Sequence, residues 1–187
     1  MARPQDPAVT DALLAATREL LAERGVAGVS IAQIAERAGV GRPTVYRRYA
    51  GKTELVMAAI RAALPNLSPP RGRTPRARFR CLMDEAFPPE PEAYLGLIGG
   101  LMAERLRHPE LIAAFREQIL LPRREIGLAA IAEAQRAGEL RGDLAPEDAV
   151  DLLAGPLLAR TFAGLDVGPL WRDRAFANWW SNVRARG

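Results

Sequence analysis

Residues 30–55 read SIAQIAERAGVGRPTVYRRYAGKTEL and contain the only lysine of the chain, Lys52. All other basic residues among the 26 Lys and Arg are arginines. Lys52 follows Gly51 at the predicted start of a helix, where the helix dipole disfavours a cation by roughly 0.3–1 kcal/mol. Helix stability therefore does not explain this lysine. A phosphate held by the ammonium together with the free N–H groups of the helix start does explain it.

The same segment predicts two short helices joined by a tight turn. Ser30 and Gln33 have the spacing of a capping box, which predicts a helix beginning directly after the serine. The Gly-Val-Gly break at residues 39–41 is short enough for the turn of a helix-turn-helix, and Gly39 can adopt the positive φ that ends a helix. Pro43 is then predicted as the first residue of the second helix.

The second predicted helix has an outer face that is basic and polar. Helical spacing directs Val45 and Tyr49 inward, whereas Tyr46 can either pack its ring or present its hydroxyl outward. Between residues 37 and 52 the chain has no acidic residue and five basic ones, namely Arg37, Arg42, Arg47, Arg48 and Lys52. Arg37 is interpreted as a solvated charge. Arginine pairs with guanine edges or phosphates, and Thr44 adds a hydroxyl, so this chemistry suits a helix in the major groove of DNA.

At these residues the chain resembles the N-terminal DNA-binding domain of the TetR (tetracycline repressor-like) family of bacterial regulators. The resemblance covers the N-terminal third of the chain and rests on Ile34-Ala35, Ala38-Gly39-Val40, Thr44-Val45-Tyr46, Tyr49, and Lys52 before Glu54-Leu55. Tyr49 stands where the family usually has Phe, and Arg48 stands where it commonly has His. The resemblance implies base contacts by Arg42, Pro43, Thr44, Tyr46 and Arg47, and phosphate contacts by Ser30, Arg48 and Lys52.

The helical signals continue along the chain and predict an all-α protein of about nine helices. The proline-rich and arginine-rich stretch 66–75 lacks an apolar period and predicts a boundary between a helix-turn-helix DNA-binding domain, residues 1–64, and a C-terminal helical bundle for effector binding and dimerisation, residues 65–187. The first predicted helix runs from Pro7 to about residue 25, the second begins at residue 31 and the third at residue 43. The remaining helices are predicted over residues 52–64, 75–87, 92–106, 110–136 with an interruption at Pro122, 146–163 and 169–184.

The last two predicted helices carry more apolar residues than one face can hold. Burial on two sides predicts a partner chain, and the predicted interface includes Val150, Leu153, Leu157, Trp171, Phe176, Trp179 and Trp180. The alternative is that the tryptophans close the core of a monomer. The TetR resemblance also implies a homodimer through these helices, which would present two recognition helices to a near-palindromic operator.

The middle helices contain apolar and aromatic residues that suit a pocket, although such a stripe also forms ordinary core. The candidate pocket residues are Met83, Phe87, Tyr94, Ile98, Leu101, Met102, Phe115 and Ile119. The resemblance implies an unidentified small-molecule effector that changes the spacing of the recognition helices. The predicted function is therefore a ligand-responsive repressor that the effector releases from its double-stranded DNA operator.

Composition argues against other classes of function. The formal charge is only +4 with a pI of about 9.9, which indicates localised positive charge. No apolar run follows Met1 and none spans a bilayer, so we expect a cytoplasmic protein without membrane contact. A single cysteine, Cys81, and a single histidine, His108, predict no intrachain disulfide, no metal site and no cofactor.

Two other classes of protein fit this sequence less well than a DNA-binding regulator does. An enzyme is not expected, because the chain has no Gly-rich phosphate loop and no paired carboxylates at a catalytic spacing. A helical adaptor that binds only protein leaves the acid-free basic helix unexplained. Such an adaptor predicts no salt-dependent affinity for DNA.

Overall fold

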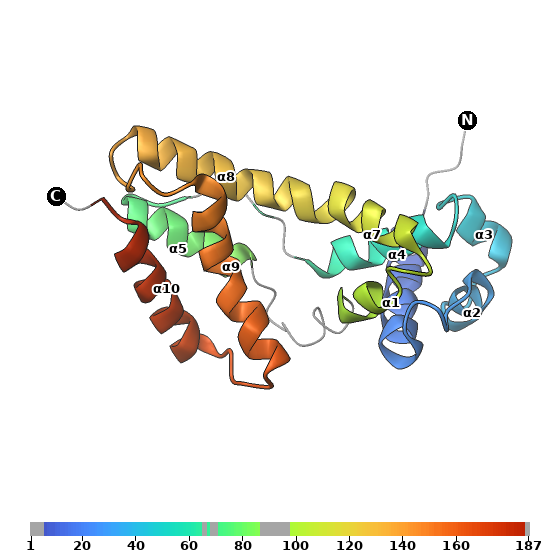
Figure 1. Ribbon diagram of the computed structural model, residues 1–187. Helices are drawn as coiled ribbons and strands as arrows, with labels where there is room; N and C mark the ends of the chain where they lie inside the picture. The colour runs from blue at the N-terminus through green and yellow to red at the C-terminus, as the bar shows by residue number, and fades with distance from the viewer. Residues whose placement is uncertain (1–5, 65–66, 68–70, 87–97, 186–187) are drawn as a thin grey trace, which may run out of the picture. The chain divides into compact units, whose positions relative to one another are not determined.

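The computed structural model describes residues 6–64, 67, 71–86 and 98–185, most of which are helical (Figure 1). By its contacts the chain divides into two compact units, Met1–Leu64 with Glu92–Ile119, and Pro65–Pro91 with Leu120–Gly187. Within the described ranges the only β-type pairing is an isolated bridge between Leu140 and Arg184, so the all-α prediction is confirmed. The predicted functional division at residue 64 stays a prediction, and by compactness residues 92–119 group with the first unit.

The first unit is built around α1 (Pro7–Arg24), which packs against α2 (Ile31–Arg37) and α4 (Lys52–Ala63). Asp6 caps α1 by accepting a hydrogen bond from the Ala8 N–H over 3.0 Å, and Pro7 occupies the first turn, where its missing N–H costs nothing. α3 (Arg42–Tyr46) contacts α2, and α7 (Pro109–Phe115) contacts α4. The core of this unit includes Leu13, Leu20, Ile34, Val45, Leu55, Ile60, Leu101, Leu111 and Phe115.

The predicted helix-turn-helix is present. Ser30 forms the capping box with Gln33, and α2 begins at the next residue. Gly39 has φ of 68°, a left-handed conformation that glycine adopts without a Cβ clash. α3 starts one residue earlier than predicted, so Pro43 is its second residue, because Gly41 in an extended conformation takes the N-cap position.

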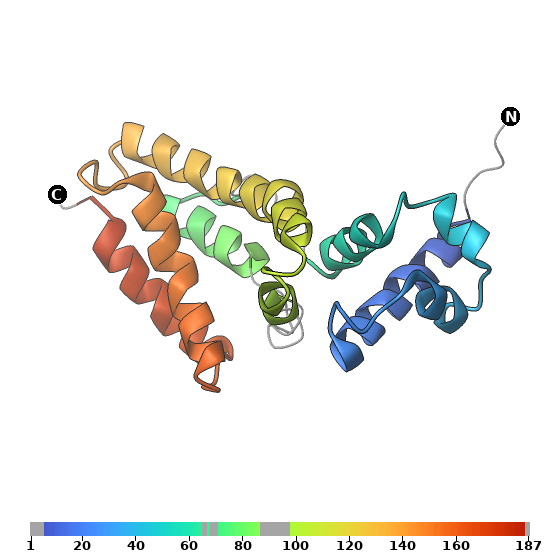
Figure 2. The same ribbon diagram turned by 45° about the vertical axis from the view of Figure 1, so that its right-hand side comes forward.

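The second unit contains α5 (Pro75–Ala86), α8 (Leu121–Arg136), α9 (Pro146–Phe162) and α10 (Pro169–Val183). α9 packs against both α8 and α10, and α9 and α10 lie side by side in both views (Figures 1 and 2). The Trp179 indole N–H donates to the carbonyl of Ala149 over 2.8 Å, and the Trp179 ring lies 5.4 Å from that of Phe79, centroid to centroid. The core of this unit is thus closed by aromatic residues of α5 and α10.

The long helix predicted over residues 110–136 is interrupted, as predicted, at the proline. α7 is followed by a π-helical turn, η1 (Arg116–Leu120), before α8 begins. In a continuous α-helix the ring of Pro122 would collide with the carbonyl four residues earlier, that of Gln118. The π-helical turn η1 widens the backbone immediately before the proline, and so avoids this collision.

The helix predicted over residues 92–106 differs from the structure at its end. Residues 98–103 are helical and residues 104–107 form tight turns, with Glu104 N–H donating to Leu101 over 3.2 Å. Pro109 disfavours helical backbone at His108, which has φ of −133° and ψ of 62°, so the helix does not continue into α7. Residues 92–97, with the predicted pocket residue Tyr94, lie outside the described residues, as does Phe87.

Among the described residues, no helix combines the length and the hydropathy that a membrane span requires.

Candidate nucleic-acid interface

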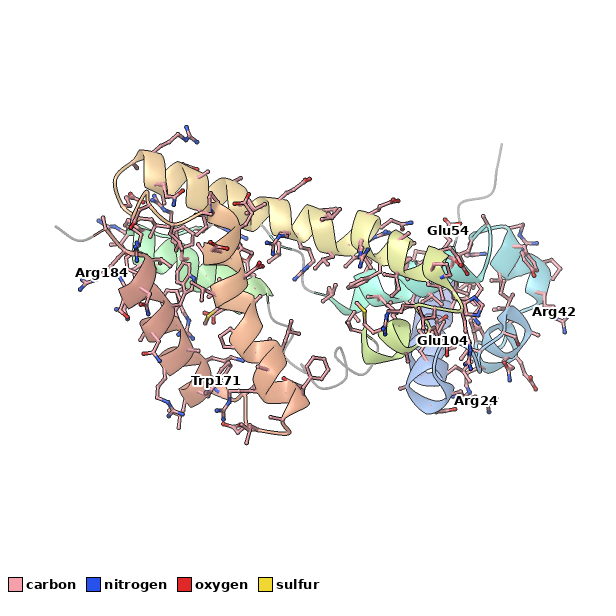
Figure 3. All side chains as sticks on the ribbon, in the orientation of Figure 1. Arg24, Arg42, Glu54, Glu104, Trp171 and Arg184 are labelled. Atoms are coloured by element: carbon pink, nitrogen blue, oxygen red, sulfur yellow. The ribbon has the colours of Figure 1, made fainter. Side chains whose placement is uncertain are left out.

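The short helix α3 presents the polar side chains that the sequence predicted for its outer face. Val45 is fully buried and Tyr49 is 9% exposed, whereas Tyr46 is 57% exposed. Of the two orientations that the sequence allowed for Tyr46, the structure therefore has the outward one. Arg42 and Arg47 are also exposed, and Arg42 points away from the rest of the first unit (Figure 3). The face therefore carries basic and hydroxyl groups together.

A small hydrogen-bond network orders the C-terminal part of this face. Arg47 Nη2 donates to Thr44 Oγ1 over 2.9 Å, and Arg48 Nη1 approaches the Thr44 carbonyl at 3.4 Å. Arg48 is half-buried, and its Nε is a buried atom with no hydrogen-bond partner in the described part of the chain. Arg42 and Pro43 are exposed, and Arg42 has no hydrogen bond to another described residue. Arg42 is thus the least restrained of the predicted base-contacting side chains.

Arg37 does not belong to this face. Its guanidinium contacts two carboxylates of α1, with Nη1 2.9 Å from Glu23 Oε1 and 3.3 Å from Glu19 Oε2. The hydrogen bond from Arg37 lowers the pKa of Glu23 from its ordinary value, and the same contact raises the pKa of Arg37. The interpretation of Arg37 as a solvated charge missed this pairing. The two glutamates lie four residues apart on one face of α1, a spacing that indicates an acidic face but does not identify its partner.

The predicted phosphate contact Ser30 is engaged inside the capping box. Its Oγ accepts from the Gln33 N–H over 3.3 Å and donates to Gln33 Oε1 over 2.8 Å. The only hydroxyl hydrogen of Ser30 is therefore used within α2. A phosphate contact by this hydroxyl, which stays a prediction, requires the hydroxyl to rotate.

Lys52 makes a contact that the sequence did not indicate. Its Nζ donates to the carbonyl of Val26, in the connection between α1 and α2, over 2.6 Å. Burial lowers the pKa of Lys52, and the carboxylate of Glu104 partly offsets this by raising it. Lys52 is the first residue of α4, and Glu54 in the same turn accepts a hydrogen bond from the Ala50 N–H over 2.5 Å. The lone lysine thus has a partner inside the protein, and its predicted phosphate contact is untested.

The predicted effector-pocket residues are divided between the two cores. Met83 belongs to the core of the second unit, whereas Leu101, Phe115 and Ile119 are buried in the first and Ile98 packs against it. Met102 is 37% exposed. Their role in ligand binding stays a prediction.

The predicted interface residues of α9 and α10 are mostly internal to the second unit. Phe176, Trp179 and Leu157 are buried, and Val150, Leu153 and Trp180 pack against the core. Trp171 is half-buried, with the Arg160 guanidinium 5.1 Å from its ring centroid. For Trp179 the structure matches the alternative in which tryptophan closes the core, and participation of these residues in a dimer stays a prediction.

The predicted interface residues do not include the apolar side chains that are most exposed on α9 and α10. Leu152 is 52% exposed, Phe162 74% and Leu170 77%. Leu152 also lines a groove of about 740 Å³, whose other lining residues include Pro156, Arg160, Trp171, Arg174 and Asn178. Of the predicted effector-pocket residues that the structure describes, none lines this groove.

The lone histidine and cysteine occupy ordinary surroundings. His108 Nδ1 lies 3.1 Å from Glu110 Oε1, and the Cys81 thiol lies 3.5 Å from Glu85 Oε1. In the described ranges, no group of three or more His, Cys, Asp and Glu side chains is placed to hold a metal ion.

The chain contains a three-helix unit with a helix-turn-helix whose second helix, α3, is basic, and it also contains a helical bundle. This combination is typical of helix-turn-helix transcriptional regulators. Two family models match the chain, "Bacterial regulatory proteins, tetR family" over residues 13–59 and "Tetracyclin repressor-like, C-terminal domain" over residues 69–177. The second match alone covers more than half of the chain. The chain belongs to the tetR family and is a DNA-binding transcriptional regulator.

Individual relatives agree with this assignment. YdeS of Bacillus subtilis, an uncharacterized HTH-type transcriptional regulator, is 29% identical over 170 residues, which cover 84% of this chain and 80% of YdeS. The solved structure of a TetR family regulator from Marinobacter aquaeolei VT8 has a TM-score of 0.67 at 23% identity and covers 99% of this chain and 100% of its own. The flavonoid-responsive regulator FrrA also gives a TM-score of 0.67, at 20% identity, and covers 97% of this chain and 100% of FrrA. At these identities the two structures show the fold alone.

Proposed function

We propose that the protein is a ligand-responsive repressor that binds a near-palindromic operator as a homodimer and is released from the operator by a small-molecule effector. Its base contacts are Arg42, Pro43, Thr44, Tyr46 and Arg47, and its phosphate contacts are Ser30, Arg48 and Lys52. The main observation that supports sequence-specific DNA binding is the outer face of α3. That face combines exposed Arg42, Tyr46 and Arg47 and bears no acidic residue.

The homodimer is supported by the exposed apolar surface of α9 and α10. A large exposed side chain such as Phe162 costs free energy in water, and a partner surface removes it from water. The groove lined by Leu152, Pro156 and Trp171 offers a concave place for side chains of a second copy. A two-fold dimer places one α3 in each half-site, with half-sites about one helical turn of DNA apart.

The proposed effector is a small, largely apolar molecule. The proposed binding residues come from the middle helices, and they are Met83, Phe87, Tyr94, Ile98, Leu101, Met102, Phe115 and Ile119. The name of FrrA, a flavonoid-responsive regulator with the same fold, supports aromatic ligands as the first class to test. Flavonoids and other aromatic compounds would be added to a preformed operator complex, and an effector is identified by dose-dependent release of the DNA.

The decisive experiment is selection of bound sequences from random duplex DNA, followed by titration of the enriched sites at two salt concentrations. The proposal expects an inverted repeat, bound by two copies of the chain, with an affinity that falls steeply as salt rises. A single unpaired half-site would remove the homodimer from the proposal. Recovery of no sequence above background, together with salt-independent affinity, would contradict DNA reading by α3.

A further inference from the structure

The outer side chains of α3 offer hydrogen-bond donors to DNA and few acceptors. Between residues 37 and 53 the chain has no Asp, Glu, Asn or Gln. Arg42 and Arg47 are exposed, and their guanidinium groups donate hydrogen bonds but cannot accept them. The hydroxyls of Thr44 and Tyr46 are the only side-chain groups of α3 that can accept. This set of groups complements bases whose edges present acceptors.

The hydroxyl of Thr44 already accepts a hydrogen bond inside the protein. Arg47 Nη2 donates to Thr44 Oγ1 over 2.9 Å, whereas no described residue accepts the hydroxyl hydrogen of Thr44. Thr44 therefore retains a donor for DNA. The same contact uses one of the five N–H groups of Arg47 and restrains the orientation of its guanidinium, which keeps enough donors for a bidentate contact.

Arg42 presents its guanidinium from the first residue of α3. It is exposed, makes no hydrogen bond to another described residue, and points away from the rest of the first unit (Figure 3). The N-terminal residues of a recognition helix are those that contact base edges in the major groove. An arginine without an intramolecular partner can form the bidentate pair with N7 and O6 of guanine.

Adenine and cytosine require side chains that α3 lacks. The major-groove edge of adenine presents an acceptor, N7, beside an amino donor, N6, and the amides of Asn and Gln match both atoms. Cytosine presents an amino donor, which a carboxylate can accept. The nearest amides and carboxylates belong to α2 and α4. Of these, α2 is the first helix of the motif, which crosses the DNA backbone instead of entering the groove.

The apolar surface of α3 suits thymine. Pro43 is exposed, and Tyr46 is 57% exposed. Thymine carries a C5-methyl group in the major groove, and apolar side-chain surface contacts that group. An A·T pair can therefore be recognised by α3 through its thymine methyl group.

We propose, on the basis of the DNA-binding function proposed above, that α3 reads each operator half-site through guanine N7 and O6 atoms and through thymine methyl groups. Arg42 and Arg47 each bond a guanine, and Pro43 and Tyr46 contact thymine methyl groups. The amino groups of adenine and cytosine are not recognised by α3. Each half-site consequently contains invariant G·C pairs at the positions that face the two arginines.

The test uses the full-length chain and the operator obtained by selection, synthesised with single modified bases and titrated by fluorescence anisotropy. 7-Deazaguanine lacks N7 and replaces each invariant guanine in turn. It is expected to weaken binding about five- to thirtyfold at the guanines that the two arginines bond. Uracil in place of thymine removes the methyl group and is expected to weaken binding about two- to fivefold. Purine in place of adenine removes only the amino group and is the matched control, with an expected change below about twofold.

Variants assign each guanine to one arginine. In Arg42→Ala the penalty for 7-deazaguanine is expected to vanish at one guanine of the half-site and to persist at the other, and Arg47→Ala is expected to show the reverse. Arg136→Ala removes the same charge from an exposed site in α8 and should keep both penalties. Thr44→Val removes the acceptor that restrains Arg47 and is expected to reduce the penalty at the guanine of Arg47, whereas Thr44→Ser is expected to retain it.

The modified bases are tested on the unmodified protein, so their outcome does not depend on the folding of a variant. If no 7-deazaguanine weakens binding, or if purine in place of adenine weakens it as much as 7-deazaguanine does, the assignment to guanine is wrong. Penalties that stay equal in Arg42→Ala, Arg47→Ala and the unmodified protein would also overturn it. If selection recovers no sequence above background, the proposed DNA-binding function itself is wrong, and the guanine contacts fail with it.

Discussion

Arg37 on α2 and Glu23 on α1 form a two-point contact, with Nη1 2.9 Å from Oε1 and Nη2 3.0 Å from Oε2. Parallel hydrogen bonds of this kind fix the orientation of a guanidinium more firmly than a single contact does. Glu19 adds a second carboxylate to the same group. The contact joins the first helix of the helix-turn-helix to the helix that supports it.

Replacing Arg37 with alanine is expected to lower the melting temperature at neutral pH by about 1–3 °C, the small effect expected of an exposed pair. The Arg37 hydrogen bond holds the pKa of Glu23 below its ordinary 4.5 in the folded state. The pair therefore stabilises the fold above that pH, and its contribution is lost as pH falls through the lowered folded-state pKa. Thermal melts of both proteins against pH should converge in acid. A difference that grows in acid would contradict this assignment.

Replacing Arg42 with alanine is expected to weaken binding to the selected operator by about 1–3 kcal/mol, with a much smaller loss on unrelated DNA. The reason is that an exposed arginine at the start of α3 is proposed to bond a base edge. Fluorescence anisotropy with operator and scrambled duplexes measures both. Arg136→Ala, at an exposed site in α8, removes the same charge and should leave the operator preference intact. Equal losses on both duplexes would reassign Arg42 to phosphate binding.

A glutamate at Phe162 or at Leu152 is expected to convert the dimer to a monomer, because each exposed apolar side chain would place a charge in the proposed interface. Light scattering coupled to size-exclusion chromatography gives the mass of each variant. Leu106→Glu, on an exposed leucine of the first unit, is the matched control and should not change the mass. Persistence of a full dimer in both α9 variants would place the interface elsewhere.

Replacing Trp179 with phenylalanine is expected to destabilise the second unit by roughly 1–3 kcal/mol, since it removes the hydrogen bond to the Ala149 carbonyl and leaves a gap in the core. Urea denaturation followed by circular dichroism measures the loss. Trp171→Phe on the same helix changes a half-buried ring and should cost less. If the two substitutions cost the same, the buried hydrogen bond of Trp179 adds little to stability.

The helix boundaries were predictable where local chemistry specifies them. Pro7 at the start of the first helix, Ser30 with Gln33, and Gly39 each act on backbone groups within four residues, and the helix starts and the turn predicted from them are confirmed. The end of the helix at residue 103 was missed, because residues 103–107 include no glycine or proline that would signal it. The predicted face of α3 also has the expected orientation, because 3.6-residue periodicity assigns Val45 inward and Arg42 outward without reference to other elements.

The partners of the charged side chains were not predictable in the same way. Arg37 is 14 residues from Glu23, and Lys52 is 26 residues from Val26 and further still from Glu104. Such pairs form only after α1, α2 and α4 have packed. A pattern of residues along one helix contains no information about which atoms another helix will bring within hydrogen-bonding distance.

The sequence by itself determined the all-α architecture, the helix-turn-helix and the basic outer face of α3, because capping, turn conformation and helical periodicity are local properties of the chain. Only the tertiary structure decided that Arg37 pairs with α1, that Lys52 is bound to Val26, and that Trp179 closes the core of the second unit. These contacts join segments far apart in sequence. Their formation depends on the packing of whole helices, in which buried apolar area sets the arrangement and the polar groups find their partners within it.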